Sequence, residues 1–171
     1  MTSFLGGLLH PLALPAHALA LLALGLLIAQ QSARLLLLAA FVAGLIAGLV
    51  ALAFAVAATS AGDILLATAA LAGLLVALAR PLPMPVSAPL AAIAGVALGL
   101  DSPPEVIILS AATVMLIGTG VGACLAVAIV AVGASYLTRD WQRIGIRILG
   151  SWIAASAILV LALRFARGLM F

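Results

Sequence analysis

Six long apolar runs, separated by short polar connections, constrain this chain more than any other feature. They cover residues 5–29, 35–58, 64–79, 86–100, 106–137 and 148–163. Such runs favour helices that cross a lipid bilayer, whereas the strands of a membrane β-barrel alternate over about 10 residues. Charged residues make up 6% of the chain, against about 25% in a soluble domain. The sequence therefore predicts an all-α membrane protein, in which residues 1–171 form one domain, a six-transmembrane-helix bundle.

The runs differ in length, which predicts local irregularities. As helices, runs 64–79 and 86–100 would be about 24 Å long, short of the ~30 Å hydrocarbon core. Run 106–137 would be about 48 Å long, so it must tilt, break or project from the bilayer. The natural place for a break is 118–122, Gly-Thr-Gly-Val-Gly. The three prolines of 80–85 predict a short cytoplasmic connection without a helix of its own, joining an antiparallel helix pair.

The arginines predict the orientation of the bundle. Five of them fall in alternate connections: Arg34, Arg80, Arg139, Arg143 and Arg147. The other connections carry Asp63, Asp101 and Glu105 and no basic residue. The positive-inside rule then places the arginine connections in the cytoplasm and both termini outside a bacterial-type inner membrane, although Arg164 and Arg167 do not fit this pattern. The isoelectric point of the chain is high, about 10.6, and this pattern attributes it to membrane topology. We therefore expect a lipid bilayer as partner, and no nucleic acid.

Small residues recur at helical spacing. Gly44 and Gly48 form a GxxxG pair, as do Gly118 and Gly122. Such pairs let membrane helices approach closely, so we expect a tight bundle. A nucleotide-binding loop at 118–122 would need a preceding strand, which the sequence does not offer.

The first run contains both histidines, and a histidine in hydrocarbon needs a partner or access to water. His10 and His17 are two helical turns apart, about 10 Å along a straight axis, which is too far to bind one ion side by side. A bend at Pro15, whose ring clashes with the carbonyl of Pro11, would bring the rings closer. Two interpretations stay open. Either the pair handles a metal or a proton, or His10 lies in the lipid interface while His17 bonds a backbone carbonyl.

Three carboxylates lie on the side where the orientation rule places the histidines. Asp63 and Glu105 each precede an apolar run, where a carboxylate caps a helix and interacts with the positive end of its dipole. The alternative is that they attract cations at an outer mouth. The sequence shows no catalytic triad, no carboxylate dyad inside the membrane and no Cys/His cluster. We therefore expect no enzyme activity.

The first run resembles the HupE/UreJ family, whose first helix carries His-Pro-x-x-Gly-x-Asp-His. Residues 10–17 read His-Pro-Leu-Ala-Leu-Pro-Ala-His, so both histidines and the proline match, while the family's aspartate is replaced by Ala16. Asp63 is similar to an acidic residue that opens the family's third helix. Glu105 matches the acid of a His-Gly-x-Glu motif before the fifth helix. Ile117 stands where that helix often carries a histidine.

This resemblance implies a HupE/UreJ-like integral membrane protein, a divalent metal (nickel) permease or metal-delivery accessory protein with several family ligands missing. It assigns metal contact to His10, His17, Glu105 and Asp63. Imidazole suits nickel, copper or zinc alike, so Ni²⁺ or another divalent metal would be the cargo, without a resident cofactor. The alternative is a non-transporting structural or assembly subunit of a larger membrane protein complex. Protein partners would be subunits of such a complex or further copies of the chain.

Overall fold

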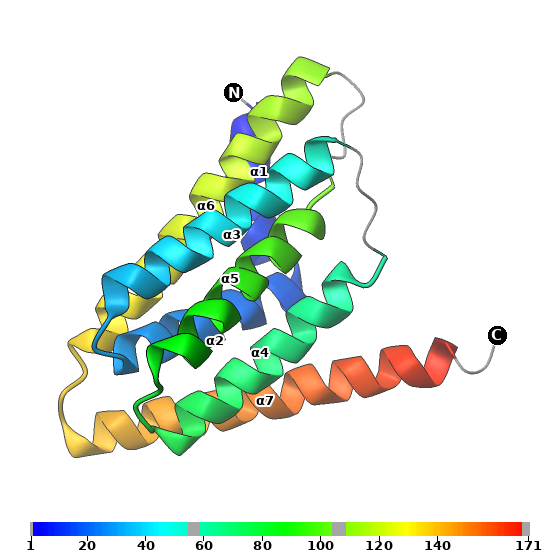
Figure 1. Ribbon diagram of the computed structural model, residues 1–171. Coiled ribbons are helices and arrows are strands. Elements are labelled where there is room, and N and C mark those ends of the chain that lie inside the picture. Colours follow the sequence, from blue (N-terminus) through cyan, green and yellow to red (C-terminus); the bar gives the residue numbers. More distant parts are fainter. Residues whose placement is uncertain (1, 55–58, 104–108, 169–171) are drawn as a thin grey trace.

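The computed structural model describes residues 2–54, 59–103 and 109–168. These residues form helices and no strand, as Figure 1 shows: α1 (Thr2–Ala13), α2 (Pro15–Gln30), α3 (Arg34–Ala53), α4 (Ala61–Leu78), α5 (Met84–Leu100), α6 (Leu109–Ser135) and α7 (Asp140–Gly168). The predicted all-α class is confirmed. The first apolar run forms two helices, and each of the others contributes one. Two predicted runs extend beyond the described residues: run 35–58 at its last four residues, 55–58, and run 106–137 at its first three, 106–108.

The number of membrane spans follows from helix length and composition. Four of the described helices are long and apolar enough to cross a membrane alone, namely α3, α4, α6 and α7. The pair α1–α2 is bent by 78° and makes a fifth if it counts as one span. α5 is also apolar, but its 17 residues reach about 25 Å, less than the ~30 Å core. The described residues therefore support four to five spans, and the predicted count of six is not confirmed.

The central helix of the bundle is α2. It contacts every other helix of the described chain, whereas α1 packs mainly on α6, α3 on α5 and α7 on α4. Figure 1 shows α7 leading away from the α3, α5 and α6 group, with α4 beside it. The side chains of Leu21, Leu27 and Ile28 on α2 are almost wholly buried. A polar side chain on α2 must therefore find its partner inside the protein.

Glycines make the closest helix contacts. At Gly44 in α3 an added Cβ would collide with the carbonyl of Ala92 in α5, and at Gly99 in α5 it would lie 2.7 Å from the backbone nitrogen of Leu49 in α3. Backbones that approach so closely exchange many dispersion contacts, which drive helix association in lipid. The predicted tight packing at the 44–48 pair is therefore confirmed.

The predicted break of the fifth run is wrong, because α6 is helical throughout 118–122. Its glycines accommodate α1 instead. A Cβ on Gly118 would lie 2.5 Å from the carbonyl oxygen of Phe4, and one on Gly122 would collide with the carbonyl of Leu8. Glycine inside a helix costs about 0.5–1 kcal/mol relative to alanine, which close packing can offset. In a bilayer, a continuous helix of 27 residues, about 40 Å long, would therefore have to tilt or project.

The proline connection is confirmed in part. Residues 80–83 form no helix, and the antiparallel neighbours α4 and α5 contact each other. Pro85, however, belongs to the first turn of α5, where a missing N–H group leaves no hydrogen bond unmade. The N–H of Leu82 donates to Oε1 of Gln31 at 2.8 Å, which ties the connection to the end of α2.

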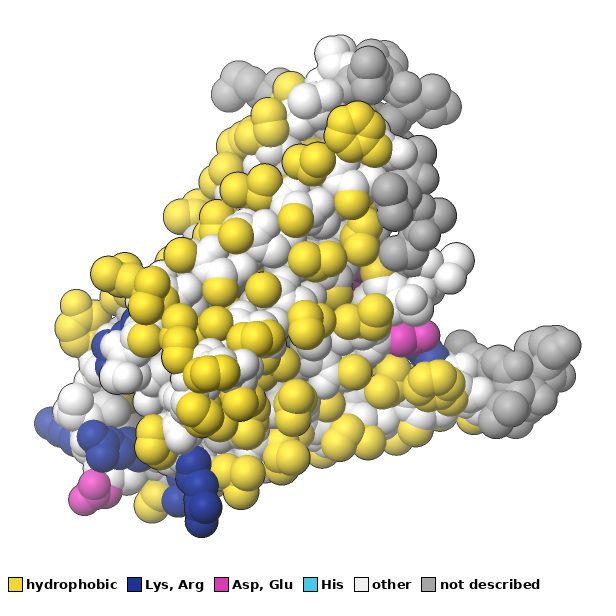
Figure 2. Space-filling view, viewed as in Figure 1, with side chains coloured by type: hydrophobic (Ala, Val, Ile, Leu, Met, Phe, Trp, Pro, Cys, Tyr) yellow, Lys and Arg dark blue, Asp and Glu magenta, His cyan; other side chains and the backbone are white. Residues whose placement is uncertain are grey.

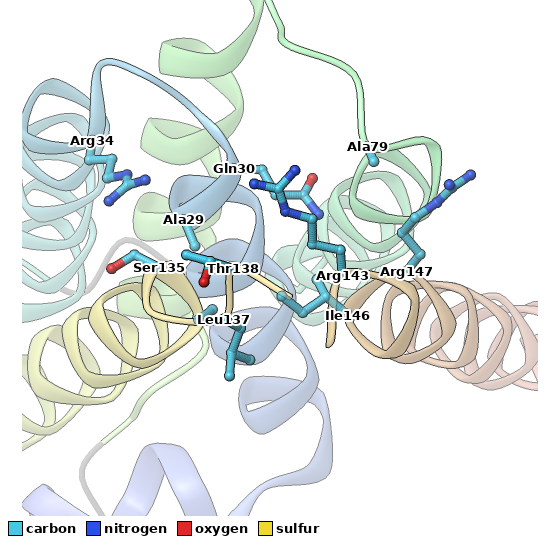
Figure 3. Close-up of a pocket in the computed structure, with 11 residues that line it drawn as sticks. Ala29, Gln30, Arg34, Ala79, Ser135, Leu137, Thr138, Arg143, Ile146 and Arg147 are labelled. Atoms are coloured by element: carbon cyan, nitrogen blue, oxygen red, sulfur yellow. The ribbon is translucent and has the colours of Figure 1, made fainter. Parts of the chain in front are cut away.

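The last helix begins earlier than the sequence predicted. α7 starts at Asp140, not near 148, so Arg143 and Arg147 lie on its first turns. An aspartate in the first turn favours this start through the helix dipole. Together with Arg34, these arginines line a cavity of about 320 Å³ between the ends of α2, α3, α4, α6 and α7, shown in Figure 3.

Apolar side chains are spread over the whole face shown in Figure 2, most of the basic side chains in view gather at one end, and one lies beside an acidic side chain away from that end. Leu35, Ile129 and Trp152 expose 82%, 69% and 68% of their surface. Water would penalise so much exposed apolar area, whereas lipid tails are as apolar as these side chains. The outer surface therefore fits an integral membrane protein.

Candidate functional site

A break in the first apolar run brings the two histidines together. α1 ends at Ala13 and α2 begins at Pro15, and between them Leu14 has an extended backbone (φ −94°, ψ 120°). The residue before a proline is driven out of the helical region, which explains the break. The ring centroids of His10 and His17 lie 5.7 Å apart at an interplanar angle of 73°. The bend expected at Pro15 is confirmed, and it replaces the ~10 Å separation of a straight helix.

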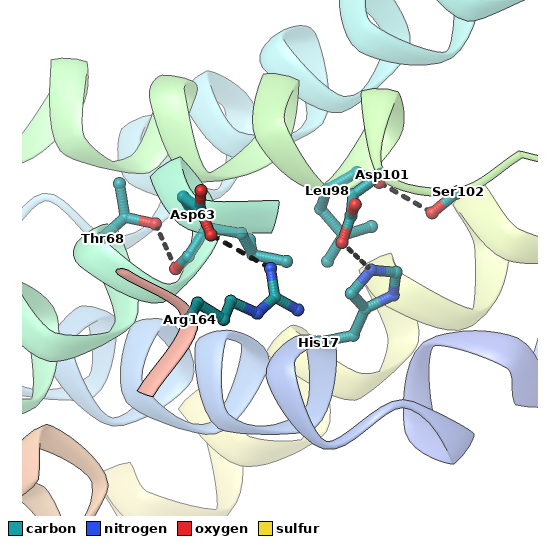
Figure 4. Close-up of polar contacts among 8 residues, drawn as sticks. His17, Asp63, Thr68, Leu98, Asp101, Ser102 and Arg164 are labelled. Carbon is teal, nitrogen blue, oxygen red and sulfur yellow. Dashed lines mark hydrogen bonds and ion pairs between the residues drawn. The ribbon is translucent and has the colours of Figure 1, made fainter. Parts of the chain in front are cut away.

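His17 is the buried end of a contact that reaches solvent. Its side chain, in the first turn of α2, is 0% exposed, and its Nε2 lies 3.1 Å from Oδ2 of Asp101. Asp101 ends α5 and is 33% exposed. Figure 4 shows the imidazole directed at this carboxylate. The partner of His17 is thus a carboxylate, and not the backbone carbonyl considered from the sequence.

This contact decides which nitrogen of His17 is available. A neutral imidazole donates through one nitrogen and accepts through the other. Because the carboxylate accepts from Nε2–H, the lone pair stays on Nδ1. Nδ1 is buried and has no hydrogen-bond partner in the described chain. Ring nitrogens that bind metals usually have this arrangement, in which the second nitrogen donates to a carboxylate.

A second polar contact lies beside the first. Asp63, in the first turn of α4, accepts a hydrogen bond from Nη1 of Arg164 in α7 at 3.1 Å. The side chains are 36% and 49% exposed, so water screens the pair and its net stabilisation is about 1 kcal/mol or less. A Cβ on Gly62 would lie 2.9 Å from Arg164 Nη1 and 3.1 Å from Asp101 Oδ1. Both contacts therefore meet at Gly62.

We call His10, His17, Asp63, Asp101 and Arg164 the polar cluster. The hydroxyl groups nearby donate to carbonyls of their own helices and so supply no further hydrogen-bond donor. Thr68 donates to the carbonyl of Leu65 at 2.8 Å, and Ser102 donates to that of Leu98 at 2.7 Å. Such bonds within one helix satisfy a buried hydroxyl without a tertiary partner.

The structure brings together only two of the four residues that were predicted to contact a metal. His10 and His17 are brought together, Asp63 is paired with Arg164, and Glu105 lies outside the described residues. Across 2–54, 59–103 and 109–168, no group of three or more His, Cys, Asp or Glu side chains could hold a metal ion. Metal contact by these residues remains a prediction.

Sequence reasoning missed Asp101 and Arg164 as members of the site. Asp101 stood out only as one of three outer carboxylates, because nothing local indicates that α5 ends beside His17. Arg164 did carry a signal, since it violated the charge pattern of the connections. Its pairing with Asp63 gives this arginine a structural reason to lie at the acidic end.

Comparison with known proteins places the chain in a family. No curated protein and no solved structure matches the chain significantly. The family model described as HupE / UreJ protein matches residues 1–160, which include both histidines, α1 to α6 and most of α7. The chain therefore belongs to the HupE/UreJ family.

Proposed function

We propose that this protein handles a divalent cation in the membrane, with nickel as cargo, as a permease or as a metal-delivery accessory protein. The observation that carries the proposal is the unpaired Nδ1 of His17, buried in the central helix while Asp101 holds Nε2. A buried acceptor without a partner costs about 1–3 kcal/mol. A bound or passing cation would satisfy it. Membership of the HupE/UreJ family supports nickel as the metal.

The second histidine supports the same interpretation. Ring centroids 5.7 Å apart leave room for an ion between two imidazole nitrogens, since each bond to the metal is about 2 Å long. His10 and His17 would be the ligands, and Asp101 would orient His17. Asp63 would act less directly, because Arg164 already neutralises part of its charge. The described residues bring no third ligand to this pair, which favours transit over tight binding, since transition metals lose their water only to several converging donors.

The charge distribution supports the orientation that accompanies this function. Five arginines lie at the end where α2, α4 and α6 finish, and the polar cluster lies towards the other end. By the positive-inside rule the arginine end is cytoplasmic, and cations would reach His17 from outside through Asp101. Six spans, with α5 as a short one, would place both termini outside.

A structural or assembly subunit of a larger membrane complex is the second candidate. It is favoured by the small number of converging ligands in the described chain and by α7, which packs mainly on α4. Much of α7 is exposed, including Leu159 at 62%. That face would be covered by lipid in a permease and by another subunit in a complex.

Uptake of labelled nickel by cells lacking other nickel permeases tests the proposal. The wild type should take up nickel, and His17→Ala and His10→Ala should each abolish uptake at equal protein levels. Leu9→Ala is a matched control, because Leu9 is adjacent to His10 and 59% exposed. No uptake above background by the wild type, together with its co-purification in a defined membrane complex, would reject the transporter in favour of the subunit.

A further inference from the structure

The basic end of the molecule holds a cavity that the proposed cation function does not use. It measures about 320 Å³, and Figure 3 shows its walls. Three arginines from two helices line it: Arg34 of α3, and Arg143 and Arg147 of α7. None of the three forms an ion pair with a carboxylate of the described chain, where both ion pairs belong to the polar cluster. Positive charge is therefore concentrated here, and Asp140 at the start of α7 is the nearest carboxylate along the chain but forms no ion pair with these arginines in the described structure.

Backbone contacts hold two of these guanidinium groups in place. Arg147 donates through Nε to the carbonyl of Ala77 at 2.9 Å, and Arg34 donates through Nε to that of Gln31 at 3.3 Å. Both bonds leave the terminal nitrogens of the fork free to donate. The side chain of Arg143 has no hydrogen bond to the described chain, and only its backbone N–H donates, to the carbonyl of Arg139 at 3.1 Å, so capping of helix carbonyls does not explain this guanidinium group. A planar fork with free donors matches the oxygens of a phosphate group.

The cavity wall also contains an unsatisfied acceptor. Gln30 donates through Nε2 to the carbonyl of Val76 at 3.2 Å, while its Oε1 is buried and accepts no hydrogen bond from the described residues. A group that brings a hydroxyl or ammonium donor together with a phosphate would suit this wall better than a bare phosphate ion.

The surroundings of the cavity favour a lipid headgroup as the kind of phosphate that would fit it. Tyr136 and Trp141 lie next to cavity-lining residues in the sequence, and they expose 76% and 66% of their surface. Exposed aromatic residues at helix ends mark the level of the lipid headgroups. A basic pocket between helices at this level is suited to the headgroup of an anionic lipid.

We propose that this cavity binds the phosphodiester headgroup of an anionic phospholipid through Arg34, Arg143 and Arg147. The acyl chains would lie against the exposed apolar surface beside the cavity. The bound lipid would join α3 to α7, which belong to different parts of the bundle (Figure 1).

The test measures lipid binding to the purified full-length chain in detergent. Native mass spectrometry counts bound phosphatidylglycerol as its concentration rises, with phosphatidylcholine in a parallel series and inorganic phosphate as competitor. Arg143→Gln is the main variant, and Arg34→Gln is a second one in case the first fails to fold. Arg139→Gln is the matched control, because it removes the same charge from the same end but Arg139 does not line the cavity.

We expect phosphatidylglycerol to bind the wild type at least tenfold more tightly than phosphatidylcholine, without displacement by equimolar inorganic phosphate. Arg143→Gln and Arg34→Gln should each weaken binding about tenfold, the loss expected for one charged hydrogen bond. Arg139→Gln should change it less than twofold. Equal losses in Arg143→Gln and Arg139→Gln would overturn the proposal, because binding would then reflect diffuse charge. Full displacement by inorganic phosphate would overturn the lipid as the source.

Discussion

His17 Nε2 lies 3.1 Å from Asp101 Oδ2, and this contact joins the first turn of α2 to the end of α5. The two residues are 84 positions apart in the chain. The contact connects a fully buried imidazole to a carboxylate that water can reach. It thereby leaves one ring nitrogen of His17 with a free lone pair, the feature on which the proposed cation handling depends.

Asp101→Asn should therefore impair cation handling more than the loss of a surface charge would. A neutral amide orients the imidazole less strongly and lowers the basicity of its other nitrogen, an effect worth about 10–100-fold at metal sites. The initial rate of nickel uptake at equal protein level should fall by that factor. Asp63→Asn, which removes a charge next to Gly62, is the control and should have a smaller effect. Equal effects would show that only the local charge matters.

Gly62→Ala should separate function from stability. The new methyl group would lie against the ends of the Arg164 and Asp101 side chains, which are flexible and can move aside. We expect a small change in thermal stability, since alanine also favours the helix by about 0.5–1 kcal/mol. Nickel uptake should fall because the Asp101 carboxylate is displaced from His17. Gly145→Ala, where an added Cβ meets nothing within 4 Å, should leave uptake unchanged.

Gly44→Ala should destabilise the fold itself. Its Cβ would collide with the carbonyl of Ala92, so α3 and α5 must move apart. Overpacking of this kind costs about 1–3 kcal/mol, and the Tm in detergent should drop by several degrees. Gly133→Ala in α6 is the matched control, because its Cβ would meet nothing within 4 Å, and it should leave the Tm unchanged or raise it. A Tm for Gly44→Ala at or above that of the wild type would contradict the close packing of α3 and α5.

The predicted orientation can be tested at two serines that flank α3. Ser32 lies just before α3 and Ser60 is the N-cap of α4, and both are exposed. In a Cys124→Ala background, Ser60→Cys should react with an impermeant thiol reagent added outside intact cells, and Ser32→Cys should react only after the membrane is opened. Ser102 lies on the same side as Ser60 in the predicted topology, but it is unsuitable for labelling because it is only 2% exposed. The reverse labelling pattern would place the polar cluster on the cytoplasmic side.

The first apolar run shows how far sequence reasoning could go. Pro15 predicted a bend near the histidines, because the effect of a proline on its own backbone is local. The glycines of 118–122 were misinterpreted as a break, because glycine permits both a bend and a close contact. Only the presence of α1 against this face of α6 decides between them. Likewise, the start of α7 was placed too late because its first turns carry arginines whose charged ends reach the interface.

The sequence by itself determined the helical class, the positions of most helices, the connection at 80–83 and the family. These features depend on apolar run length, proline geometry and a motif within one helix, which are local in the chain. Only the tertiary structure decided that Asp101 is the partner of His17, that Arg164 pairs with Asp63, and that three arginines share one cavity. In an almost uniformly apolar chain, composition does not specify which helices become neighbours. The close contacts of glycine and alanine backbones specify it, and they bring together polar residues that no sequence spacing connects.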